Sequence, residues 1–135
     1  MDDVLHAFQE GGWPMYLVLL CTMATHPLAL GIAITAFASK RKGMVIGLAA
    51  ASLVFALSTA CVGAGGYLWG MQQVNEAVAY ADPEYVEMMR AQGQREASWN
   101  WICGAIGAAL PALLSLIALV RGVTMRADER PSARG

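Results

Sequence analysis

Charged side chains are scarce in this sequence and are absent from its longest apolar stretch. Asp, Glu, Lys and Arg make up 14% of the 135 residues, and none of them occurs in residues 44–71. A helix of those 28 residues rises about 42 Å, which exceeds a hydrocarbon core about 30 Å thick. The Ser and Thr residues of the stretch, Ser52, Ser58 and Thr59, can hydrogen-bond to their own helix backbone. We therefore predict that residues 44–71 cross a membrane.

Two further stretches have the composition of membrane spans. Residues 15–37 supply 23 mostly apolar residues and residues 101–120 supply 20 more, again without Asp, Glu, Lys or Arg. Together the three stretches hold 71 of the 135 residues, which leaves no room for a separate soluble domain. We predict one all-α domain over residues 1–135, a polytopic membrane protein whose three transmembrane helices contact the lipid bilayer.

Motifs of soluble enzymes and nucleic-acid-binding proteins are also missing. The sequence has no Gly-rich phosphate loop before a lysine, no paired-cysteine or His-x-x-x-His metal spacing, and no nucleophile with a base nearby. Its three cysteines, Cys21, Cys61 and Cys103, fall one per span at different depths, and a net charge of −1 does not favour nucleic acid. We expect no enzymatic activity, no metal or other cofactor, and no nucleic-acid partner.

The cations are unevenly distributed between the two sides of the predicted spans. Residues 39–43 and the tail from Arg121 onward hold seven of the nine Lys and Arg residues, and Arg90 and Arg95 are the other two. The positive-inside rule then predicts that the N-terminus is outside and the C-terminus is cytoplasmic. Six aromatic residues map to the outer ends of the spans, as in an interfacial belt: Trp13, Tyr16, Tyr67, Trp69, Trp99 and Trp101.

The segments outside the spans are short. Residues 3–10 are predicted to form a helix at the headgroups, which Gly11 and Gly12 end. In the outer loop, residues 72–100, Asp82 is predicted to cap a second helix that ends at Gly93. The inner tail, residues 121–135, is short and charged.

The first span carries a histidine near its centre. His26 is the only ionisable residue of the Asp, Glu, Lys, Arg and His set in any span, and Thr22 and Thr25 lie within one helical turn of it. Ionisable residues at such depth are functional candidates, so His26 is a candidate for proton or ligand traffic. A structural interpretation is also open, because a neutral imidazole can bond a hydroxyl or carbonyl across a helix interface, and Pro27 frees the carbonyl of Met23.

Small residues recur on the second and third spans at helical spacing. Such faces favour close packing of transmembrane helices. The predicted packing residues are Ala56, Ala60, Gly63, Gly66 and Gly70 in the second span and Gly104, Ala108 and Pro111 in the third. Small faces on two of three spans exceed what one three-helix monomer is expected to bury, so we predict a homo-oligomer.

Three short motifs resemble the ExbB/TolQ/MotA proton-channel family. Residues 8–23 (FQEGGWPMYLVLLCTM) resemble the family's outer helix, double glycine and start of the first span. Residues 66–71 (GYLWGM) resemble its G-T-V-W-G-M, and residues 109–112 (ALPA) resemble its A-I-P-A. The resemblance implies a subunit of the bacterial inner membrane that forms a ring around or beside a single-span ExbD/TolR-like partner and couples proton flow to work.

The sequence departs from this family where the family is polar. Five residues, 39–43, replace the long cytoplasmic segment between the first two spans. Tyr67, Trp101 and Ile102 occupy positions where the family has threonines near its proton path. Two functions follow as alternatives. In one, the protein is a ring-forming channel subunit, and the proton-path candidates that replace the missing hydroxyls are His26, Thr22, Thr25 and Thr59. In the other, it is a non-conducting structural or assembly protein.

Overall fold

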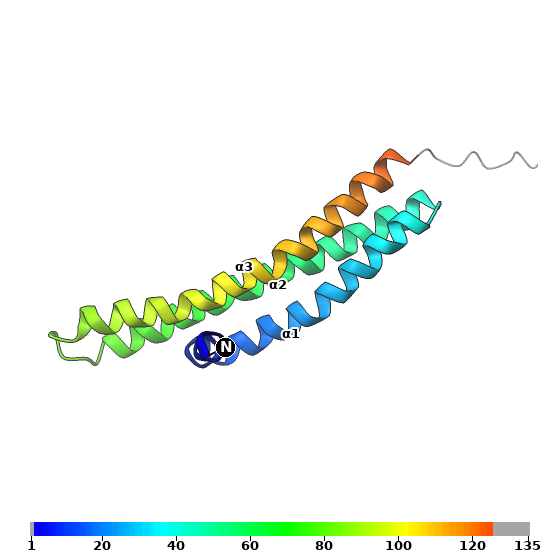
Figure 1. Ribbon diagram of the computed structural model, residues 1–135. Helices are drawn as coiled ribbons and strands as arrows, with labels where there is room; N and C mark the ends of the chain where they lie inside the picture. The colour runs from blue at the N-terminus through cyan, green and yellow to red at the C-terminus, as the bar shows by residue number, and fades with distance from the viewer. Residues whose placement is uncertain (1, 126–135) are drawn as a thin grey trace, which may run out of the picture.

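The described part of the protein consists of three long α-helices. The computed structural model describes residues 2–125, with side chains described from residue 12 onward. Helix α1 is Asp2–Ala38, α2 is Lys42–Val78 and α3 is Val86–Thr124, and the helices run alternately up and down (Figure 1). Each contains an apolar stretch long enough to cross a membrane. The predicted fold class, an all-α protein with three transmembrane helices, is confirmed; the part of the predicted inner tail after residue 125 lies outside the described residues.

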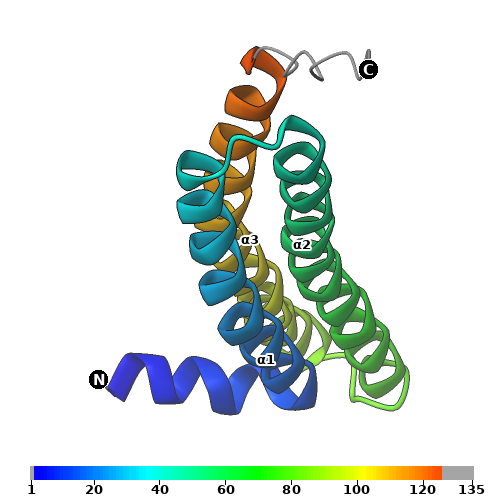
Figure 2. The same ribbon diagram turned by 90° about the vertical axis from the view of Figure 1, so that its right-hand side faces the viewer.

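Gly12 divides α1 into two parts. Its φ of 64° and ψ of −163° belong to a backbone region that is essentially restricted to glycine. The part of α1 before Gly12 runs sideways from the bundle, whereas the part after it follows the bundle (Figure 2). The 27 residues of Gly12–Ala38 rise about 40 Å and can span a bilayer. The predicted helix before the first span is therefore present, and its place at the headgroups stays a prediction.

Helices α2 and α3 form a hairpin that extends past the bend of α1 (Figure 1). Their 37 and 39 residues correspond to about 55 and 58 Å. Most of the predicted outer loop, residues 72–100, is thus helical, and only residues 79–85 connect the two helices. The predicted cap at Asp82 is wrong: Asp82 begins a turn, its carbonyl accepts from the N–H of Tyr85 at 2.9 Å, and Tyr85 is the N-cap of α3.

The prediction that a helix ends at Gly93 is also wrong, because α3 continues through Gly93. A Cβ atom at this position would collide with the side chain of Val74 on α2. Gly93 therefore lets the two helices approach each other, and the packing of the hairpin outweighs the low helix propensity of glycine.

Small residues line the contact between α2 and α3, which we call the seam. The buried residues of both helices recur mainly at alternating intervals of three and four, the spacing of two helices that pack over many turns. They are Val45, Ala49, Ser52, Ala56, Thr59, Gly63 and Gly66 on α2 and Ala97, Asn100, Gly104, Gly107, Ala108, Pro111, Ser115, Ala118 and Gly122 on α3. Gly107 differs from the others in that it faces Thr22 of α1. Larger residues such as Leu57, Leu68 and Ile106 are exposed on the outside of the bundle, where lipid can cover them.

The two ends of the bundle are formed by different connections between the helices. One end, the hairpin end, holds the connection 79–85, and the other, the basic end, holds the connection 39–41 and the last turn of α3. Near the basic end α1 joins the seam in a small apolar core, formed by Ile32, Ala36, Val45, Ala49 and Ala118.

Candidate functional site

In the seam, the backbone of Gly63 on α2 lies directly against the backbone of Gly104 on α3. A Cβ atom on Gly63 would lie 2.6 Å from the carbonyl oxygen of Asn100 and 2.8 Å from the Cα of Gly104. A Cβ atom on Gly104 would lie 2.8 Å from the Cα of Gly63 and 3.2 Å from the carbonyl oxygen of Thr59. Since backbone atoms cannot move aside as side chains can, both positions require glycine at this helix separation.

The other predicted packing residues lie along the same seam. Gly66 faces Asn100 and Pro14, where a Cβ atom would come within 3.1 Å of both side chains, and Gly70 faces Ala97 at 2.9 Å. Ala56, Ala108 and Pro111 are buried and Ala60 is half-buried. These small faces turn toward each other within one molecule. They therefore need no second copy of the chain, and the predicted homo-oligomer requires other support.

A buried pair of hydroxyls crosses the seam. The oxygens of Ser52 on α2 and Ser115 on α3 lie 2.8 Å apart and share a hydrogen bond. Ser115 also donates to the carbonyl of Pro111 at 2.7 Å. Hydroxyl pairs of this kind add a polar link between helices that otherwise pack by shape. Sequence reasoning missed this link. The spacing of four and then three residues from Ser52 through Ala56 to Thr59 could have shown that Ser52 lies on the packing face.

The imidazole of His26 is bound to its own helix. Its Nδ1 lies 2.8 Å from the carbonyl oxygen of Thr22. Because a carbonyl can only accept, Nδ1 must donate, and in the neutral ring Nε2 is then an acceptor. The predicted structural bond across a helix interface is therefore replaced by a bond within α1, and the carbonyl used is that of Thr22 rather than Met23. The side chain is half-buried.

The three threonines of the candidate proton path are also held locally. Thr25 is buried and donates to the carbonyl of Cys21 at 2.9 Å, and Thr59 is buried and donates to the carbonyl of Phe55 at 3.3 Å. Thr22 packs against Gly107 of α3 and lines an apolar cavity of about 200 Å³ between α1 and α3. The structure thus places Thr22, Thr25 and His26 within two turns of α1 and Thr59 on α2. Thr25, His26 and Thr59 each form a hydrogen bond with a carbonyl of their own helix, and Thr22 packs against Gly107.

Two cations tie helix ends together at the basic end. Arg121 of α3 reaches the last turn of α1, where its Nε donates to the carbonyl of Ala36 at 2.7 Å and its Nη2 to that of Phe37 at 3.3 Å. Lys42, at the start of α2, donates to the carbonyl of Val123 in the last turn of α3 at 3.1 Å. Carbonyls in the last turn of a helix lack partners within that helix and carry partial negative charge. Each cation therefore satisfies and stabilises the end of a neighbouring helix.

The cysteines and possible metal ligands are scattered through the bundle. Cys21, Cys61 and Cys103 are free thiols. Among residues 12–125, no group of three His, Cys, Asp or Glu side chains lies close enough to hold a metal ion. In this part of the chain, the imidazole of His26, the seam and the basic end are three polar features that could serve a function.

Comparison with protein-family models, with curated proteins and with solved structures finds no match for this chain. Its function is therefore inferred from the positions of its own residues.

Proposed function

We propose that the chain is an integral membrane subunit of an oligomeric complex, in which α1 meets a neighbouring transmembrane helix around His26. The observation that supports this proposal is the place of the imidazole. His26 lies near the middle of the span Gly12–Ala38, and its side chain is partly exposed on the surface of the bundle. Hydrocarbon offers no hydrogen-bond partner to the second ring nitrogen, whereas a polar group on a neighbouring helix does.

Within this complex the chain acts as a structural or assembly subunit and catalyses no reaction. The seam supports this role, because the glycine contacts and the Ser52–Ser115 pair join α2 and α3 into one long hairpin. The buried hydroxyls of Thr25 and Thr59 support it as well, since each is engaged with a carbonyl of its own helix. The hairpin then serves as a fixed support that presents α1 to its neighbour.

A proton-coupled role is the second candidate, and the grouping of Thr22, Thr25 and His26 in one turn of α1 favours it. In this form the complex is a ring like that of the ExbB/TolQ/MotA family, located in the bacterial inner membrane. A single-span ExbD/TolR-like partner supplies a carboxylate opposite the imidazole. A mid-membrane imidazole can change charge only where such a carboxylate or water reaches it.

Substitution of His26 tests the complex. His26→Gln keeps a donor and an acceptor, so we expect the purified protein in mild detergent to assemble as the wild type does. His26→Leu removes both, and an interhelical hydrogen bond in a membrane contributes about 0.6–2 kcal/mol, so we expect association about 3- to 30-fold weaker. Thr35→Val is the matched control, since Thr35 lies on the same helix and donates to the carbonyl of Gly31. Association unaffected by His26→Leu would contradict the proposed contact.

Proton flux into liposomes separates the two roles. The complex is reconstituted with any protein that co-purifies, and dissipation of a pH gradient is measured for the wild type and His26→Gln. The structural role predicts no flux above that of empty liposomes in either case. Flux in the wild type that His26→Gln abolishes would instead establish the proton-coupled role.

The proposed orientation places the N-terminus outside and the C-terminus in the cytoplasm. Gln92 at the hairpin end and Lys40 at the basic end are both exposed, so each is replaced by cysteine in a chain whose native cysteines are changed to alanine. Because seven of nine cations lie on one side, we expect an impermeant thiol reagent to label Gln92→Cys in intact cells and to label Lys40→Cys only after permeabilisation. The reverse pattern would refute the orientation.

A further inference from the structure

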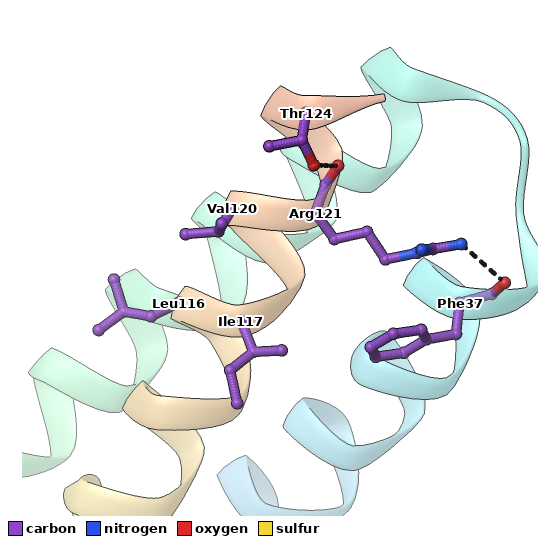
Figure 3. A pocket seen from close by; sticks show the side chains of 6 residues that line it. All are labelled: Phe37, Leu116, Ile117, Val120, Arg121 and Thr124. Carbon is purple, nitrogen blue, oxygen red and sulfur yellow. Dashed lines mark hydrogen bonds between the residues drawn. The ribbon is translucent and has the colours of Figure 1, made fainter. Parts of the chain in front are cut away.

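A groove lies between α1 and α3 at the basic end. The groove is open to the outside and has a volume of about 440 Å³. It is lined by Phe37, Leu116, Ile117, Val120, Arg121 and Thr124 (Figure 3). Phe37 comes from the last turns of α1 and the other five residues come from the end of α3. The walls are therefore apolar except at one end, where Arg121 and Thr124 lie.

Arg121 is held across the end of this groove. Its bonds to the carbonyls of Ala36 and Phe37 draw the side chain from α3 toward α1, and its guanidinium lies 4.7 Å from the centre of the Phe37 ring. An arginine has five N–H donors. Two of them serve the carbonyls, so the guanidinium keeps donors for a further oxygen ligand without leaving this position.

The positive charge of Arg121 lies far from the acidic side chains of the described chain. From residue 12 to residue 125, the Asp and Glu residues are Glu76, Asp82, Glu84, Glu87 and Glu96. The one nearest along α3, Glu96, is 25 residues away, which corresponds to about 37 Å of helix. Lys40 and Arg41 are exposed at the same end as Arg121. The basic end thus attracts anions.

The depth of the groove matches the layers of a bilayer. Arg121 directly follows the apolar run of residues 101–120, so its guanidinium lies at the level of the headgroups. Ile117 lies one turn closer to the membrane centre, about 6 Å along the helix. A cation at headgroup level above an apolar wall is the arrangement that binds anionic lipids between transmembrane helices.

We infer that this groove binds an anionic glycerophospholipid of the leaflet at the basic end. The lipid phosphate accepts hydrogen bonds from the remaining N–H groups of Arg121. One acyl chain lies along Leu116, Ile117 and Val120. This site is independent of the proposed complex, because all of its residues belong to one chain.

Lipid binding to the purified full chain tests this inference. Native mass spectrometry measures binding of phosphatidylglycerol and of phosphatidylcholine to the wild type and three variants. We expect the wild type to prefer phosphatidylglycerol about fivefold, the contribution of one basic residue near a membrane surface. Arg121→Gln should abolish this preference. Ile117→Trp should reduce binding of both lipids by filling the groove, and Arg90→Gln, at the hairpin end, should change nothing.

Control measurements separate loss of lipid binding from loss of folding. Circular dichroism establishes that every variant keeps the helix content of the wild type. If Arg121→Gln loosens the end of α1, Ile117→Trp still tests the groove, because it leaves the bonds of Arg121 in place. Glycerophosphoglycerol, which carries the phosphodiester of phosphatidylglycerol without acyl chains, should not displace the lipid. A preference for phosphatidylglycerol that survives Arg121→Gln, or lipid binding unchanged in Ile117→Trp, would overturn the site.

Discussion

Replacement of Gly63 by leucine is expected to force α2 and α3 apart and to destabilise the protein strongly. The reason is that Gly63 contacts backbone atoms of α3, which cannot move aside as a side chain can. A Cβ atom on Gly63 already falls 2.6 Å from the carbonyl oxygen of Asn100 and 2.8 Å from the Cα of Gly104, so the whole helix must shift to admit a side chain. Overpacking a well-filled contact costs about 3 kcal/mol, and the shift also removes neighbouring contacts along the seam.

Gly65→Leu is the matched control for this prediction. Gly65 lies on the same helix, two residues away, and a Cβ atom there would meet nothing within 4 Å. The two variants therefore have the same composition and differ only in the face that carries leucine. Unfolding in mixed micelles with increasing SDS, followed by tryptophan fluorescence, measures their stability. We expect Gly65→Leu to be at least as stable as the wild type, since leucine favours a helix over glycine. Equal unfolding midpoints for the two variants would refute the close packing at Gly63.

The membrane fold could be predicted from the sequence because it depends on a property that composition records. Residues 44–71 hold no charge over 28 positions, and hydrocarbon admits such a stretch only as a helix or a strand of a closed barrel. The length of α2 and α3 beyond the membrane was harder to predict. Gly93 suggests a helix end by its propensity, whereas in the structure its missing side chain makes room for Val74.

The packing residues were identified from their size, and their partners were not. The sequence analysis grouped Ala56 with Ala60, which is four residues later. The buried positions of α2 instead alternate between spacings of three and four residues, and they include Ser52 and Thr59. A face of small residues shows that something packs closely against it. Whether that partner is another helix of the same chain or of a second copy depends on the topology, and in this protein α3 fills the place.

The hydrogen-bond partners of the polar side chains differ most from expectation, because they depend on the rotamer that each side chain adopts in the structure. From the sequence, His26 could bond across an interface, yet a carbonyl one turn earlier, that of Thr22, lies within reach of Nδ1. Arg121 shows the opposite case. Its charge only predicts which side of the membrane it lies on, and the structure reveals that its side chain crosses from α3 to the carbonyls that end α1.

The bend in α1 gives the second large prediction, because it coincides with a glycine whose φ is positive. Gly12 has φ 64° and ψ −163°, a conformation that a residue with a Cβ atom adopts at a cost of about 1–3 kcal/mol. The bend also sets the start of the span, where the ring of Trp13 meets that of Trp69 edge to face at 5.5 Å. Gly12→Ala is therefore expected either to lower stability by about 2 kcal/mol or to relieve the strain by straightening α1.

Both results can be measured on one pair of variants. A straightened α1 would extend beside the part of the hairpin that projects past Gly12, so spin labels on cysteines at positions 9 and 80 should move closer in Gly12→Ala. Gly31→Ala is the control, since Gly31 is helical in α1 and a Cβ atom there meets nothing within 4 Å. Alanine favours a helix by about 1 kcal/mol over glycine, so this control should be as stable as the wild type or more so. If Gly12→Ala matches Gly31→Ala in both stability and label distance, the bend does not require glycine, and another contact must hold the N-terminal part of α1 in its sideways position.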